Sequence, residues 1–111
     1  MTDQRFRPLA TFSGLRKVPL IAISYNSIYP SLTVTSENVT IVVVRTHRFA
    51  WSEIETIKAG WLFGQMITIV PKGGWRTFSA TFYGRPAAVT ALRALQAAGA
   101  PLAPSALAWL T

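Results

Sequence analysis

The sequence predicts a single, mainly β domain, a small twisted β-barrel or sandwich of about seven antiparallel strands closed by one C-terminal α-helix. Three observations lead to this prediction. Apolar and polar residues alternate in residues 31–35, and a β-branched run follows at residues 39–44. Paired glycines separate two further strand-like runs, residues 66–70 and 75–83. After Gly84 the composition changes abruptly to alanine and leucine, the strongest helix formers.

The size and composition of the chain limit what it can be. Its 111 residues include no cysteine, 50% are hydrophobic and 14% are charged. A globular chain of this length buries roughly two thirds of its unfolded surface, which is enough for one core without a metal or a disulfide. The composition excludes a disulfide scaffold, a disordered acidic tail and a multidomain enzyme. We expect one domain over residues 1–111, in which residues 1–30 supply N-terminal strands and residues 100–111 form an apolar tail.

The N-terminal half is expected to contain two strands and a hairpin. The two strands are residues 6–12 and 18–25, and the Gly-containing segment 13–17 divides them. The hairpin comprises residues 31–44, because the small polar residues 36–38 suit a tight reversal of the chain. Counting both N-terminal strands brings the expected total to about seven.

The next β segment, residues 47–58, is expected as one bent strand or as two short ones. A second hairpin joins residues 66–70 to residues 75–83, since glycines supply the positive φ angles of a tight turn. Polar and apolar residues alternate in the last strand, which predicts one face in the core and one in water. The residues expected on the wet face are Thr77, Ser79 and Thr81.

One helix is predicted, at about residues 86–98. Pro86 suits the first helical position, and Gly99 is a natural left-handed stop. Spacings of three and four residues place an apolar stripe on this helix, by which it would lie on the sheet: Ala88, Val89, Leu92 and Leu95.

The middle of the chain contains a specific sequence pattern. Residues 32–35 (Leu-Thr-Val-Thr) are followed by residues 39–41 (Val-Thr-Ile), and then by an Arg-apolar-x-Trp-Ser-Glu-Ile strand at residues 48–54. From about residue 28 to residue 99 the chain resembles the bacterial pleckstrin-homology-like (PH-like) domains, which are small twisted β-barrels or sandwiches closed by a C-terminal helix. The resemblance implies this fold and a binding role. Many family members have transmembrane helices beside the domain, and this chain lacks them, so we expect a free-standing module.

The charge balance favours anionic partners. Basic residues outnumber acidic ones by 11 to 4, which gives a formal charge of +7. Two basic pairs are candidate contacts for an anion or a phospholipid headgroup. Arg16 and Lys17 lie in the loop between the first two strands, where the resemblance places phosphoinositide ligands in some pleckstrin homology domains. Arg45 and Arg48 flank the end of the first hairpin, where two guanidinium groups can grip a phosphate. The alternative for both pairs is an ordinary solvated surface.

The chain contains few side chains that could take part in catalysis. The chain has one histidine, no cysteine and four carboxylates. Glu53 and Glu55 would face the same side of a strand, and a solvated strand face is the favoured interpretation. His47 is expected in a loop, either as a phosphate contact or as a surface residue without a role. We therefore expect no enzyme, no metal site and no cofactor.

Two apolar segments call for an explanation. Trp61, Leu62 and Phe63 lie in residues 59–64, which are expected to form a loop, and loops normally avoid exposing such residues. This segment would plug the barrel, insert into a membrane interface or dock on a partner subunit. The tail, which contains Trp109, is also too apolar to be solvated. It would pack on its own domain or cap a second copy, and the second interpretation is slightly favoured.

The function expected from the sequence is a non-catalytic PH-like binding module. Its partner would be another protein or a second copy, or else anionic phospholipid headgroups. We expect it in the cytoplasm or peripherally at the inner membrane face, because the N-terminus lacks the apolar core of a secretory signal and no apolar run approaches the roughly 20 residues of a membrane span. The alternative is a small basic β-barrel that binds nucleic acid and stacks bases on Trp61 and Trp75.

Overall fold

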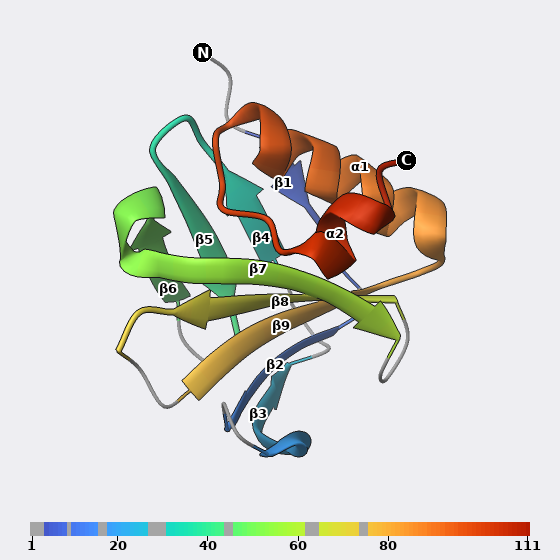
Figure 1. The fold of residues 1–111 in the computed structure, drawn as a ribbon. Coiled ribbons are helices and arrows are strands. Elements are labelled where there is room, and N and C mark those ends of the chain that lie inside the picture. The colour runs from blue at the N-terminus through green and yellow to red at the C-terminus, as the bar shows by residue number, and fades with distance from the viewer. Residues whose placement is uncertain are drawn as a thin grey trace.

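The computed structural model describes seven stretches of the chain: residues 4–8, 10–15, 18–26, 31–43, 46–61, 65–73 and 76–111. Within these stretches the chain forms nine β-strands in two antiparallel sheets, a short 3-10 helix and two α-helices (Figure 1). No helix in this part of the chain is both long enough and apolar enough to cross a bilayer.

The strands form a four-stranded and a five-stranded sheet. The four-stranded sheet has, in spatial order, β1 (Gln4–Phe6), β4 (Ser31–Val34), β5 (Asn38–Val42) and β6 (Thr46–Ala50). The five-stranded sheet has, in spatial order, β3 (Val18–Asn26), β2 (Ala10–Leu15), β9 (Arg76–Phe82), β8 (Gln65–Pro71) and β7 (Ile54–Trp61). The helices are η1 (Trp51–Glu53), α1 (Arg85–Ala97) and α2 (Pro104–Ala108).

Two of the connections between the sheets include contacts among the described residues. The N-terminal segment belongs to both, because β1 pairs with β4 and β2 pairs with β9. Pro8 lies between β1 and β2 and cannot donate a ladder hydrogen bond, which suits a change of sheet. The hydroxyl of Thr11, in β2, also donates to the carbonyl of Val42, in β5. The second connection is η1, where the backbone N–H of Ala50 donates to Glu53 Oε1 at 2.9 Å.

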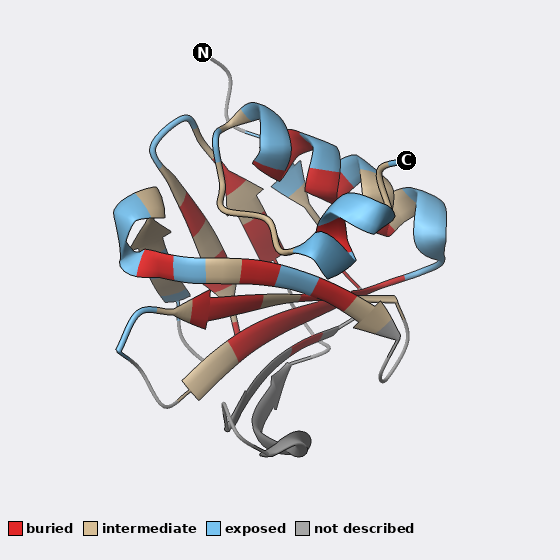
Figure 2. Cartoon of the chain, in the orientation of Figure 1, coloured by how far each residue is buried: buried red, intermediate tan, exposed pale blue. Residues whose placement is uncertain are grey.

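The core lies between the two sheets and under the helices. Figure 2 shows buried residues along the sides of α1 and α2 that face the strands. Fully burying a large aliphatic side chain stabilises the fold by about 1.5–3 kcal/mol, so this shared cluster supplies most of the stability. Its largest members, each at most 2% exposed, come from both sheets and α1: Leu32, Ile41, Ile54, Ile57, Ile67, Ile69, Leu92 and Leu95.

The structure confirms the mainly β fold, both hairpins and the helix, with nine strands in place of about seven. The segment 47–58 is two strands separated by η1, not one bent strand. Gly99 follows α1 with a φ of +90°, as expected of a left-handed stop. Of the predicted helix stripe, Ala88, Leu92 and Leu95 are buried, whereas Val89 is half-buried. Two further alanines complete the buried face, Ala91 and Ala94.

The expectation of a wet face on the last strand is wrong. Ser79 is 6% exposed and Thr81 is 4% exposed. Strand β9 is the central strand of its sheet, so neighbours on both sides cover these small side chains. Ser79 shares a 2.9 Å hydroxyl–hydroxyl hydrogen bond with Thr68, whereas the Thr81 hydroxyl has no partner among the described residues.

These two hydroxyls predict opposite effects on stability. Replacing Thr81→Val should raise the free energy of unfolding by about 1 kcal/mol, because it removes a buried hydroxyl that makes no hydrogen bond. Replacing Ser79→Ala should lower it by about 1 kcal/mol, because it leaves Thr68 without its partner. Urea titration of both variants and the parent checks the pair. Equal destabilisation by the two substitutions would contradict this account.

Candidate functional site

The structure describes only part of the predicted anion-binding set. Arg16, Lys17 and Arg45 lie outside the described residues. Arg48 is exposed on β6, opposite Thr40 of β5, and its Nε donates to the Thr40 hydroxyl at 3.3 Å. This cross-strand bond orients the guanidinium on the outer face of the four-stranded sheet. The pairing of Arg48 with Arg45 stays a prediction.

His47 lies in strand β6 and not in a loop, so that expectation is wrong. Its ring is half-buried, and its centroid lies 4.4 Å from that of Phe78, which belongs to the other sheet. Phe49 meets the same Phe78 ring at 5.3 Å, and the Arg76 guanidinium carbon lies 5.3 Å from its centroid. The reason is strand pairing: β6 pairs with β5 along its whole length and carries His47 and Phe49 toward the other sheet.

Glu53 and Glu55 do not share a strand face. Glu53 belongs to η1, where its carboxylate accepts the N–H of Ala50, whereas Glu55 is exposed on β7. Across the described stretches, no three His, Asp or Glu side chains gather in a way that could hold a metal ion.

The apolar segment 59–64 is partly strand, which corrects the expected loop. Strand β7 continues through Trp61, because Ala59, Gly60 and Trp61 pair with residues of β8. Pairing with a neighbouring strand outweighs the local preference of glycine for loops. Leu62 and Phe63 lie outside the described residues, so the roles expected for this segment stay predictions.

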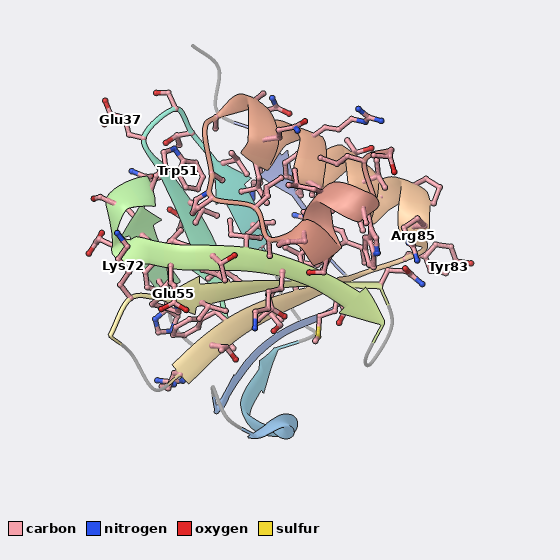
Figure 3. All side chains as sticks on the ribbon, in the orientation of Figure 1. Glu37, Trp51, Glu55, Lys72, Tyr83 and Arg85 are labelled. Carbon is pink, nitrogen blue, oxygen red and sulfur yellow. The ribbon has the colours of Figure 1, made fainter. Side chains whose placement is uncertain are left out.

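A surface that the sequence analysis missed lies where β9 ends and α1 begins. Tyr83 is 84% exposed, and Figure 3 shows it beside Arg85. The Nε of Arg85 donates to Gln65 Oε1 at 2.8 Å, and its guanidinium carbon lies 3.9 Å from the centre of the Trp109 ring. Arg85 thus joins the start of β8 to the C-terminal tail. We call Tyr83, Arg85 and Trp109 the Tyr83 surface.

The C-terminal tail packs on its own domain. It runs beside β7 (Figure 1) and forms a parallel bridge between Leu102 and Ile57. Ala106 of α2 is fully buried, and Trp109 packs against the core. The sequence slightly favoured a tail that caps a second copy. Because these residues are already covered within one chain, their burial does not require a second copy.

Two features of this region were not predicted from the sequence, and the reason can be given for each. Ser105 looks like a helix N-cap, but α2 begins at Pro104 and the Ser105 hydroxyl instead accepts the N–H of Ala59 at 3.2 Å. Tyr83 follows an alternating strand and reads as one more strand residue. The available signal was the turn after it, where Gly84 has a φ of +84° and directs the chain away from the sheet.

Comparison with solved structures gives an informative likeness. No family model matches this sequence, and no curated protein matches it. The fold is similar to that of a chain in the structure of the Spt16D Pob3N heterodimer, with a TM-score of 0.59 and 10% sequence identity over 92% of the present chain. The chain has a PH-like fold. It spans 53% of the length of that Spt16D Pob3N chain, and membership of the bacterial PH-like family stays a prediction.

The role of Arg85 in holding the tail can be measured. Replacing Arg85→Ala should lower the free energy of unfolding by about 1 kcal/mol, because it removes the hydrogen bond to Gln65 and the contact with the Trp109 ring. Arg93→Ala, an exposed position on the same helix, is the charge-matched control and should change stability by less than about 0.5 kcal/mol. Thermal unfolding distinguishes them, and equal effects would refute a specific role for Arg85.

Proposed function

We propose that this chain is a non-catalytic PH-like module of the cytoplasm that binds a protein partner. The observation that carries the proposal is Tyr83, which is 84% exposed and lies two residues before an arginine already held in position. Tyrosine, tryptophan and arginine dominate the binding energy of protein interfaces, and the Tyr83 surface contains one of each. Because Gln65 and Trp109 hold Arg85, little side-chain entropy is lost when a partner covers it.

Two further observations support the proposal. The Spt16D Pob3N structure is a heterodimer, so a similar fold occurs in a protein assembly, although fold alone is a weak guide to function. Two acid–base groups among the described residues have structural partners. Glu53 caps η1, and the His47 ring packs on Phe78. These contacts favour a binding module over an enzyme.

Binding of anionic phospholipid headgroups is the second candidate. It is motivated by the formal charge of +7 and by Arg48, which is exposed at the edge strand of the four-stranded sheet. It has less support than protein binding, because Arg48 already donates to Thr40 and the other three basic candidates lie outside the described residues. Nucleic-acid binding is motivated by the net charge and by the expected stacking of bases on Trp61 and Trp75.

The protein-binding proposal is tested at Tyr83. A photoreactive phenylalanine analogue placed at position 83 should crosslink a defined protein in the native host, and the same analogue at Thr90, exposed on α1, should not. Calorimetry with the purified partner should then show that Tyr83→Ser weakens binding about tenfold or more, while Thr90→Ser leaves it unchanged. Identical crosslinking at positions 83 and 90, or an unchanged affinity of the Tyr83→Ser variant, would rule out this surface.

The headgroup candidate is tested with vesicles of phosphatidylserine and phosphatidylcholine. If Arg48 contacts the headgroups, Arg48→Ala should reduce co-sedimentation more than Arg93→Ala, although both remove one positive charge. Equal reductions that vanish at physiological salt would indicate net charge alone and would reject a headgroup site at Arg48. A single-stranded oligonucleotide titrated at low salt provides the corresponding check for nucleic acid.

A further inference from the structure

The outer edge of β7 carries paired backbone groups although β7 is the last strand of its sheet. An edge strand normally presents unpaired N–H and C=O groups, to which another chain can add. Here the N–H of Ile57 donates to the carbonyl of Pro101 at 2.8 Å, and the N–H of Ala103 donates to the carbonyl of Ile57 at 2.8 Å. The N–H of Ala59 donates to the Ser105 hydroxyl at 3.2 Å. The tail thus lies along this edge in a parallel bridge, in the place where a further strand would add.

The composition of the tail shows what kind of segment binds along the edge of β7. Residues 101–111 contain no charged side chain, and the segment changes from extended to helical at Pro104. Ala106 is fully buried, and Leu102, Trp109 and Leu110 pack against the core. The edge of β7 therefore recognises an uncharged, apolar segment through backbone hydrogen bonds, one hydroxyl and one small buried side chain.

Only residues 98–100 connect this bound segment to α1. The reversal within them depends on Gly99, whose φ of +90° is a conformation that other residues rarely adopt. A Cβ atom at this position would meet nothing within 4 Å, so the glycine is needed for its backbone angle and not for space. If residues 98–100 were extended, the tail would point away from its own β7.

We propose that the edge of β7 is a strand-accepting site that takes the tail of a second copy of this chain, in reciprocal exchange with its own. A second copy supplies the segment whose fit is already shown, down to the Ser105 hydroxyl, the buried Ala106 and the Trp109 ring on Arg85. Reciprocal exchange preserves every tail contact, changes only the link at residues 98–100 and closes as a two-fold dimer. This proposal goes beyond the Tyr83 surface and does not depend on it.

The test replaces Gly99→Val in the full-length chain, with Gly73→Val as the matched control. Both glycines have positive φ angles, +90° and +67°, and a Cβ atom at either would meet nothing within 4 Å, so each substitution adds backbone strain alone. Only Gly99 lies at the link to the tail. Because opening the link relieves the strain in both chains, the dimerisation constant of the Gly99→Val chain should rise about a hundredfold, or about tenfold per chain. The control should keep the dimerisation constant of the parent chain.

Light scattering over a concentration series gives the mass, and hydrogen exchange reports the edge. In the Gly99→Val dimer the Ile57 and Ala59 amides should stay protected, because the tail of the partner occupies the same site. Adding Ala106→Asp should abolish the dimer and the protection, since a carboxylate cannot dock at a fully buried position. Adding Leu107→Asp, on the 42% exposed residue next to it, should leave both intact.

Three results would overturn the proposal. A monomeric Gly99→Val chain with protected amides would show that the tail stays in place despite the strain. A monomer with unprotected amides would show release without exchange. A dimer that survives Ala106→Asp would have formed through another surface, and its loss in Tyr83→Ser would identify that surface. If Gly99→Val does not fold, Gly99→Ala tests the same φ with a smaller side chain and an expected rise of about tenfold or more.

Discussion

The arrangement of the C-terminal tail depends on the backbone N–H and C=O groups of Ile57, which need hydrogen-bond partners. Its side chain is fully buried in the core, so its N–H and C=O groups cannot be left unpaired without a cost of about 1–3 kcal/mol each. Pro101 and Ala103 supply these partners. Once residues 101–103 are fixed along β7, α2 must follow, and Trp109 comes to lie below Arg85. A backbone requirement in one strand thereby positions an aromatic side chain far along the sequence.

The Tyr83 surface is consequently a product of tertiary structure. Its residues come from the end of β9, the first turn of α1 and the segment after α2. Strand β8 contributes Gln65, whose side-chain oxygen orients Arg85. A binding surface assembled from separate elements is rigid only if those elements are packed together, which the shared core ensures. In this chain the two sheets and α1 therefore provide the shared core, and the proposed recognition surface lies around the ends of the strands.

Much of the fold could be predicted because its signals are local. Alternation in residues 31–35, the glycines after Pro71, and Pro86 and Gly99 around the helix each act within a few residues. The predictions that were wrong concern residues whose surroundings are set by neighbours distant in sequence. Ser79 is buried because β9 is central, and His47 packs on Phe78 because the sheets face each other. Of the candidate site residues, only Arg48 and Trp109 have described side chains, and no local pattern indicated that Trp109 would lie against Arg85.

The N-terminal segment shared by both sheets has a kinetic consequence. Thr11 of β2 pairs with Ala80 of β9, so β2 is synthesised well before the strand that pairs with it on this side. At a synthesis rate of about 5–20 residues per second, that delay lasts several seconds, during which the edge of β2 opposite β3 is unpaired. Contacts of such sequence separation also slow folding. Closure of the five-stranded sheet is thus a late step in folding, and nascent chains are most exposed to misassociation before it.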